Sequence, residues 1–473
     1  MKKWAASLLV VHLALLPVAV PAKEPSGAYL AGRQASLSND YAAAARYYAR
    51  ALMQDRKNPA LMENALLAFL ALGQIREALP IALNLEKSVP GNQASAFVIA
   101  ADMLGPDGDI DGDLPTIGPV VDSLLAAWRL LDRGKTEEAF AAFDEMIEDE
   151  RMRAFGSYHR AMALAQVGDL EAADELFSGQ DGATGLLTRR GTIAHAQVLS
   201  QLGRFEDAID LLNRGIGAED LTVQKYVAEF SQDKPIAYDV VTTPREGYAE
   251  TFHSIAIALS GQAADGFTLL YSRIAEYLDP KNTDAILLSA GLLEQLEQFE
   301  LATDAFDRVP RESDAFVEAE IGRANALQAA EREDAAIEVL NQLSETHPEV
   351  SRVHIALGDT LRRMSRFEES SAAYEKAIAL FTDPRPQQWP IYYARGITYE
   401  RIDKWPEAEA DFRLPLELNP GQPHVLNSLG YSFVEMGQTL DEAMAMIEEA
   451  AAARPDEGYI TDSLGWVFFR HGR

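Results

Sequence analysis

The chain has 473 residues, of which 48% are hydrophobic, and its formal net charge is −31. This hydrophobic content is enough to bury a core and argues against global disorder, while the acidic balance argues against nucleic-acid partners and anionic membrane surfaces. An acidic surface favours basic partners without identifying one. The absence of cysteine excludes disulfides, thiolate catalysis and iron–sulfur clusters.

Residues 1–22 have the pattern of a secretory signal peptide. Lys2 and Lys3 form a positive start, an apolar run follows over residues 5–20, and Ala22 stands at the end of a small-residue cleavage site. The run is short and interrupted for a membrane span, although an uncleaved N-terminal anchor is the alternative. The sequence therefore predicts a periplasmic or secreted protein with no transmembrane span after cleavage.

Residues 23–104 predict pairs of helices that recur about every 34 residues. We name the first helix of a pair the A helix and the second the B helix. Residues 93–104 read as an A helix, but the B helix expected after them is missing. An acidic, glycine-rich loop stands in its place at 105–118.

This acidic loop resembles the first half of an EF-hand calcium loop. Asp107, Asp109 and Asp111 are followed by Gly112, which gives oxygen ligands at positions 1, 3 and 5 and a glycine at position 6. Position 12 should be a bidentate Glu, but Gly118 stands there. The three aspartates are thus a candidate calcium site, and a solvated loop kept extended by like charges is the alternative.

The helical period resumes over 119–215. Gly134, Gly168 and Gly203 are 34 and 35 residues apart, and each is predicted to lie in the turn between an A and a B helix, where a positive φ is often required. Residues 216–247 break the pattern with β-branched pairs and two prolines, and only Val223–Phe230 keep a helical period. We interpret them as an irregular insert that packs over one face of the array.

A second array occupies 248–473 and ends in the clearest repeat of the chain. The sequence NSLGY at 427–431 returns as DSLGW at 462–466, 35 residues later. Ala443, Ile447 and Pro455 lie between the two copies. The small Gly430 lets the B helix approach, and Pro455 ends that helix because it lacks a backbone donor.

These features resemble the tetratricopeptide repeat, a helix–turn–helix unit of 34 residues. The resemblance covers most of 25–473 and implies an all-α, right-handed superhelical solenoid, because one pair cannot bury its apolar face alone. The last A helix, 459–470, has no B helix after it. Either the chain is incomplete relative to its relatives, or another chain covers this half unit.

No catalytic motif is present. The sequence contains no dinucleotide-binding, Walker A, nucleophile-elbow or HExxH pattern, and no two histidines have metal-ligand spacing on one helix. An isolated histidine is therefore interpreted as a surface or satisfied core residue. We predict that the protein is not an enzyme and needs no cofactor, apart from calcium at the acidic loop.

The resemblance also implies that A helices line a concave groove, in which extended peptides or partner helices dock. The groove positions of the C-terminal units are held by aromatic, arginine and amide side chains, which are common interface anchors: Tyr393, Arg401, Asn427, Tyr431, Asp462, Trp466 and Arg470. We therefore predict a protein-binding scaffold of the cell envelope. Periplasmic binding of a small ligand or glycan fragment, and a calcium-dependent structural role, are the alternatives.

Overall fold

The computed structural model describes residues 24–179 and 188–472. Over these residues the chain forms 25 α-helices and one short 3-10 helix and contains no strand, which confirms the all-α solenoid of helix pairs. The predicted signal peptide lies outside the described residues. Among the described helices, each is too short or too polar to span a bilayer. The chain divides into two compact units, residues 1–122 and 123–473.

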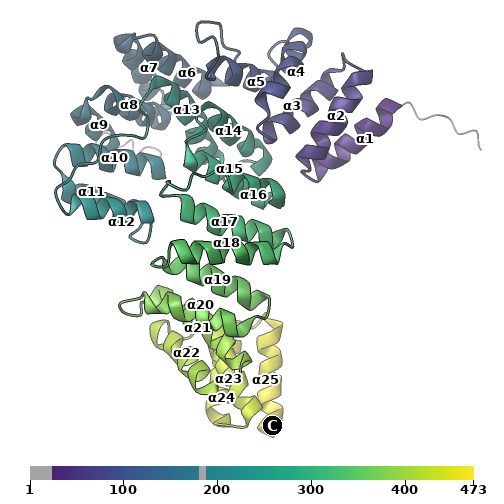
Figure 1. Cartoon of the computed structure of the whole chain (residues 1–473), viewed down its shortest axis with the longest axis vertical. Coiled ribbons are helices and arrows are strands. Elements are labelled where there is room, and N and C mark those ends of the chain that lie inside the picture. Colours follow the sequence, from purple (N-terminus) through teal and green to yellow (C-terminus); the bar gives the residue numbers. More distant parts are fainter. Residues whose placement is uncertain (1–23, 180–187, 473) are drawn as a thin grey trace, which may run out of the picture. The chain divides into compact units, whose positions relative to one another are not determined.

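The described part of the first unit is a stack of five helices, in which each helix packs on the next along the chain (Figure 1). They are α1 (Glu24–Leu37), α2 (Tyr41–Gln54), α3 (Pro59–Ala71), α4 (Ile75–Ser88) and α5 (Gln93–Leu104). The A helices α3 and α5 are also in contact. Residues 105–118 form a loop, after which α6 (Pro119–Asp132) begins.

The second unit begins within α6, and six helices follow before the regular array. They are α7 (Thr136–Glu148), α8 (Arg153–Val167), α9 (Leu170–Phe177), α10 (Arg189–Gln201), α11 (Phe205–Gly215) and α12 (Leu221–Phe230). Helix α12 lies inside the segment predicted to be an irregular insert. The Asp220 side chain caps it, and Val223, Tyr226 and Phe230 are buried at helical spacing.

The rest of the second unit is a regular array of helix pairs. Its helices are α13 (Pro244–Leu259), α14 (Asp265–Leu278), α15 (Thr283–Gln295), α16 (Phe299–Phe306), α17 (Phe316–Ala329), α18 (Glu333–Thr346), α19 (Ser351–Arg363), α20 (Phe367–Ala379), η1 (Pro386–Gln388), α21 (Trp389–Arg401), α22 (Trp405–Leu418), α23 (Pro423–Met436), α24 (Leu440–Ala453) and α25 (Gly458–Arg470). Figure 1 shows the pairs following one another from α13 to α25.

Small residues in the A helices allow the B helices to pack closely. A Cβ atom built at Gly358 would lie 2.7 Å from the Tyr374 ring of α20, and one at Gly430 would lie 2.8 Å from Ile447 of α24. Both distances are shorter than a carbon–carbon contact allows. The predicted role of Gly430 is therefore confirmed.

The turns between A and B helices contain a residue with a left-handed backbone. Gly134, Gly168 and Gly203 have φ values of 72°, 90° and 75°, as predicted. Other turns place Glu331 or Asp403 there, both with a φ of 59°. A non-glycine residue in this region costs roughly 1–2 kcal/mol, so the packing of the helices on either side determines these turns.

The second unit is not a simple linear stack, because α13 packs against α8, which lies far back in the sequence. After α12 the chain runs through irregular residues 231–243 and then forms α13. Tyr248 of α13 donates a hydrogen bond of 2.9 Å to Asp132 of α6, and a Cβ atom on Gly247 would lie 2.2 Å from the Trp128 ring. Helices α9 to α12 therefore form a side branch between two segments that touch each other.

The side branch also contacts the later array. Lys225 of α12 forms an ion pair of 2.9 Å with Asp314, and Leu221 packs against a core cluster that includes Val317 and Val353. Glu219, just before α12, lies 3.1 Å from Arg385. The segment 216–247 is thus held against the turns that precede α17 and α21.

Candidate functional site

The candidate site is the face formed by the A helices of the last five repeats, which we call the A-helix face. Helices α17, α19 and α21 are in contact in that order, and so are α23 and α25. The Tyr393 hydroxyl joins α21 to α23 through a hydrogen bond of 2.9 Å with Ser428. Side chains from five repeats are therefore arranged on one surface.

Four of the predicted contact residues are exposed. Tyr431 exposes 42% of its surface, and Arg401, Asp462 and Arg470 are also classed as exposed. The guanidinium of Arg470 lies 5.6 Å from the centre of the Trp466 ring, a cation–π distance. These side chains are available to a partner without any rearrangement of the repeats.

The other three predicted residues are engaged within the protein. Tyr393 is half-buried and packs against Phe412, with ring centroids 5.9 Å apart. The Trp466 indole donates a hydrogen bond of 2.6 Å to Glu435. Asn427 is only 6% exposed, and its Oδ1 has no hydrogen-bond partner. The two aromatic side chains therefore contact neighbouring helices, and the Asn427 amide is buried with its oxygen unpaired.

Sequence reasoning missed a cleft and an exposed aromatic residue on this face. The cleft has a volume of about 410 Å³ and lies between α17 and α19, lined by Glu318, Ile321, Asn325, Arg352, Ile355, Ala356, Asp359 and Arg363. An ion pair of 2.8 Å between Arg352 and Glu318 joins the two helices beside it. Phe469 of α25 is 70% exposed and stacks on Trp466 with ring centroids 5.5 Å apart. Ile321 and Ile355 are 34 residues apart and occupy the same position in consecutive repeats, which is the signal that could have pointed to the cleft.

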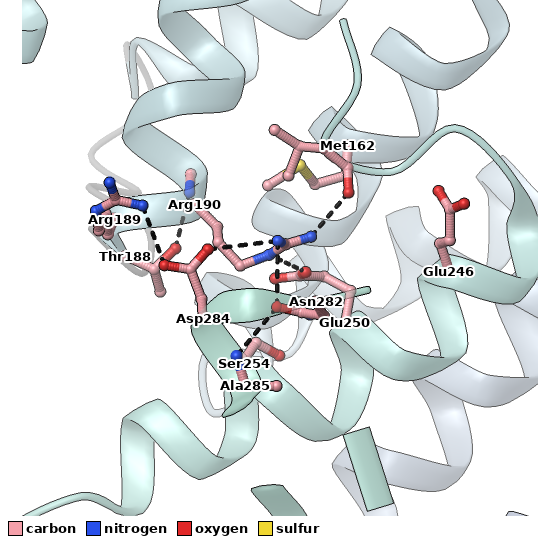
Figure 2. A network of polar contacts seen from close by, with 12 residues as sticks. Met162, Thr188, Arg189, Arg190, Glu246, Glu250, Ser254, Asn282, Asp284 and Ala285 are labelled. Atoms are coloured by element: carbon pink, nitrogen blue, oxygen red, sulfur yellow. Dashed lines mark hydrogen bonds and ion pairs between the residues drawn. The ribbon is translucent and has the colours of Figure 1, made fainter. Parts of the chain in front are cut away.

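A second candidate is a buried polar network centred on Arg190 of α10. The Arg190 guanidinium donates to Glu250 at 2.7 Å, to Asn282 at 3.3 Å and to the Val240 carbonyl at 2.8 Å, and Asp284 lies 3.5 Å away. Figure 2 shows Glu250, Asn282 and Asp284 arranged around this guanidinium. The network joins α10, α13 and α15.

The charges of this network are fixed by their surroundings. Burial alone would raise the pKa of Glu250, but the nearby Arg190 charge outweighs it, and the pKa falls to about 2. Burial raises the pKa of Tyr158, whose hydroxyl donates a 2.7 Å hydrogen bond to Glu250. Glu250 is therefore a carboxylate and Tyr158 a neutral phenol at neutral pH.

A histidine and a serine next to this network do not form a catalytic pair. His159 Nδ1 accepts a hydrogen bond of 3.0 Å from the Trp128 indole, so its proton is on Nε2 and is donated to Ser254 Oγ at 3.0 Å. Ser254 in turn donates to the Thr251 carbonyl. A general base would have to accept the serine proton. Both His159 and Ser254 are also fully buried, so the pair is structural.

The acidic loop does not bring its aspartates together in this structure. Asp107 lies 3.3 Å from Arg76 of α4, and the Asp109 side chain accepts a hydrogen bond from the backbone of Asp111. Within residues 24–179 and 188–472, no three His, Asp or Glu side chains are grouped closely enough to hold a metal ion. Calcium binding by this loop stays a prediction, which a calcium titration followed by thermal unfolding would test.

Comparisons with known proteins were made at the level of family, sequence and structure. The family model described as tetratricopeptide repeat matches residues 355–423, which run from α19 to the start of α23. A TPR repeat-containing protein of Pseudomonas aeruginosa is 24% identical over 192 residues, which is 40% of this chain and 32% of that protein. The chain thus spans about a third of the length of the curated relative it matches.

Solved structures resemble the chain at low identity. Yeast Tom70 is 14% identical, with 95% of each chain covered and a TM-score of 0.38. The Cut9–Hcn1 complex gives 12% identity, 94% of this chain, 96% of that chain and a TM-score of 0.38. Pseudomonas aeruginosa PilF gives 15% identity, 48% of this chain, 99% of that chain and a TM-score of 0.39. At these scores nothing about function is carried over.

Proposed function

Because this chain is a tetratricopeptide repeat protein, a kind of protein that binds other proteins, we propose that it is a non-enzymatic scaffold and that its A-helix face binds a partner segment. The observation that carries this proposal is the exposure of Tyr431, Arg401, Arg470 and Phe469 on neighbouring A helices. Aromatic and arginine side chains dominate the binding energy of protein interfaces.

The cleft between α17 and α19 supports the proposal that the A-helix face is the binding surface. Its half-buried Ile321 and Ile355 offer apolar surface, while Asn325 and Arg352 at its rim offer hydrogen-bond donors. A side chain of a bound segment would remove the two isoleucines from water, which is the favourable term in most protein association. The cleft and the exposed aromatic residues lie at opposite ends of the face, so a segment of several residues can use both.

We propose further that the protein works in the cell envelope, in the periplasm or after secretion. The signal-peptide pattern of residues 1–22 and the absence of cysteine support this location, because stray thiols are a liability in an oxidising compartment. Fractionation of cells that express the chain would test it. Recovery of the protein in the cytosol with residues 1–22 intact would contradict export.

The binding proposal is tested by partner capture from an envelope extract with a matched pair of variants. Tyr431→Ala/Phe469→Ala removes two exposed rings from the A-helix face, and Tyr29→Ala/Leu37→Ala removes two exposed apolar side chains from α1. All four side chains are at least 38% exposed, so we expect both variants to stay folded.

We expect the first variant to lose a partner that the wild type and the second variant retain. Equal capture by all three proteins would place the interface elsewhere, and the next region to test would be 216–247. Capture of no partner by the wild type would contradict the scaffold proposal.

A further inference from the structure

The base of the side branch, at α10, is firmly joined to the later array. The side chain of Arg190 is only 12% exposed and pairs at 2.7 Å with the fully buried Glu250 of α13. Next to it, Arg189 donates a hydrogen bond of 3.1 Å to Asp284 at the start of α15 and one of 2.9 Å to Thr222 of α12. Charge-assisted contacts of this kind are strong, and breaking a buried one is costly. The base therefore stays attached to α13 and α15.

The tip of the side branch is held by weaker contacts. Lys225 pairs with Asp314 and Glu219 pairs with Arg385, but three of these four side chains are more than half exposed. Exposed ion pairs contribute little to stability, because water and salt screen them. These two pairs can therefore break and form again at low cost. We call residues 219–225 the strap.

A cleft lies between the strap and the array. It has a volume of about 530 Å³, and its walls come from the strap, from the start of α19 and from the loop between α20 and α21. A closely packed interface would leave no such space. The apolar contact of the strap is made by Leu221, which is half-buried against the core cluster of α17 and α19. Separation of the strap would therefore expose little apolar surface.

The large buried side chains of α12 pack within the side branch. The Phe230 ring lies against Phe205 of α11, with ring centroids 6.2 Å apart. The Tyr226 hydroxyl accepts a hydrogen bond of 2.8 Å from Gln197 of α10. Helix α12 therefore keeps these contacts when the strap separates from the array.

The side branch contacts the starts of four consecutive A helices. The residues contacted lie at the start of α15, before α17, before α19 and before α21: Asp284, Asp314, Val350 and Arg385. In a repeat array each unit normally contacts only its neighbours. Here one segment joins four repeats, and its ion pair between Glu219 and Arg385 spans 166 positions of the chain.

The same helix starts lie beside the cleft of the A-helix face. Arg352, the second residue of α19, lines both the cleft under the strap and the cleft between α17 and α19. Its ion pair of 2.8 Å with Glu318 joins α19 to α17. The spacing of these two helices determines the width of the cleft between them. Contacts that restrain their starts therefore also restrain the A-helix face.

We propose that the strap restrains the spacing of the repeats from α15 to α21 and separates reversibly from them, and that the array can then change its curvature. This inference goes beyond the proposed function and does not depend on it. The curvature of a solenoid follows from small rotations between neighbouring repeats. A restraint across four repeats therefore controls the shape of the A-helix face.

The experiment measures the distance between two turns that the strap connects. The chain has no cysteine, so Glu312→Cys/Gln387→Cys places one spin label before α17 and one in η1, both at exposed positions. The test variant Glu219→Gln/Leu221→Ala/Lys225→Met removes the three contacts of the strap in this labelled full chain. Double electron–electron resonance gives the distribution of distances, and circular dichroism shows whether each variant is folded.

The matched control loses contacts of the same kinds elsewhere, namely two exposed ion pairs and one half-buried leucine at the start of a helix. It is Lys135→Met/Glu300→Gln/Leu440→Ala. We expect a broader distribution with a shifted mean distance in the test variant, and the wild-type distribution in the control. The same distribution in all three proteins would overturn the inference, because each repeat would then be held by its neighbours alone. An equal change in the control would also overturn it, since the effect would not be specific to the strap.

Discussion

The buried ion pair between Arg190 and Glu250 predicts a large loss of stability for Glu250→Gln. Glu250 is fully buried and accepts hydrogen bonds of 2.7 Å from both Arg190 and Tyr158. The substitution keeps the size of the side chain but removes its charge. It also allows the new amide group to face the Arg190 guanidinium, where two donors would meet.

The magnitude follows from what remains around Arg190. Removing one partner of a buried ion pair costs about 3–5 kcal/mol, because a buried charge is left uncompensated. Asp284 still lies 3.5 Å from the guanidinium, and the Val240 carbonyl still accepts a hydrogen bond of 2.8 Å from it. These contacts place the expected loss at the lower end, about 3 kcal/mol.

The assay is equilibrium urea unfolding at pH 7, followed by far-UV circular dichroism. The matched control is Glu300→Gln, because Glu300 pairs with Arg332 at 3.1 Å but both side chains are at least half exposed. We expect the control to lose no more than about 1 kcal/mol. A loss of less than about 1 kcal/mol for Glu250→Gln would refute the reasoning, since the network would then not depend on its charge.

Two further predictions concern protonation and close packing. Burial lowers the pKa of His159 from 6.5 to about 4. As the pH falls, this imidazole is therefore protonated in the unfolded chain before it is protonated in the folded one. The free energy of unfolding should fall by about 3 kcal/mol as the pH drops from about 6.5 to about 4. His159→Gln should reduce that slope in urea unfolding, and an unchanged slope would contradict the neutral, buried imidazole. Gly430→Ala should destabilise the protein by about 1–3 kcal/mol, because the added Cβ would lie 2.8 Å from Ile447. Gly465→Ala should instead stabilise α25 by up to about 1 kcal/mol in thermal unfolding, because the added Cβ has no neighbour within 4 Å. Equal changes in stability for the two substitutions would show that contact with the B helix does not determine their effects.

The helix pairs could be predicted from the sequence because their determinants are local and periodic. Gly358 and Gly430 permit close approach of the B helix, and Gly134, Gly168 and Gly203 mark turns at a constant interval. The turns at Glu331 and Asp403 carry no such signal, since their left-handed backbone is imposed by the helices on either side.

The side branch could not be predicted, because it depends on contacts between distant residues. His159 and Ser254, or Tyr158 and Glu250, are more than 90 positions apart, and neither member of a pair stands out in its own segment. The sequence therefore marked segment 216–247 by the loss of its period outside Val223–Phe230. Helix α12 within it has a cap and a buried stripe, but both are short.

The sequence predicts which side chains lie on A helices, but not which of them are exposed. The repeat position places Tyr393 and Tyr431 on A helices, but it does not tell which ring packs against a neighbouring helix. Tyr393 is paired with Ser428, whereas Tyr431 is 42% exposed.

The return of α13 to α8 has a consequence for synthesis on the ribosome. Trp128, Tyr158 and His159 are made long before Glu250 and Ser254, the residues that cover them. At a translation rate of about 5–20 residues per second, the 92 positions between Tyr158 and Glu250 take about 5–20 s. During this interval Tyr158 lacks its acceptor Glu250, and His159 lacks the contact with Ser254, although the Trp128 indole can already donate to His159. The polar contacts between α8 and α13 can therefore form only after α13 has emerged.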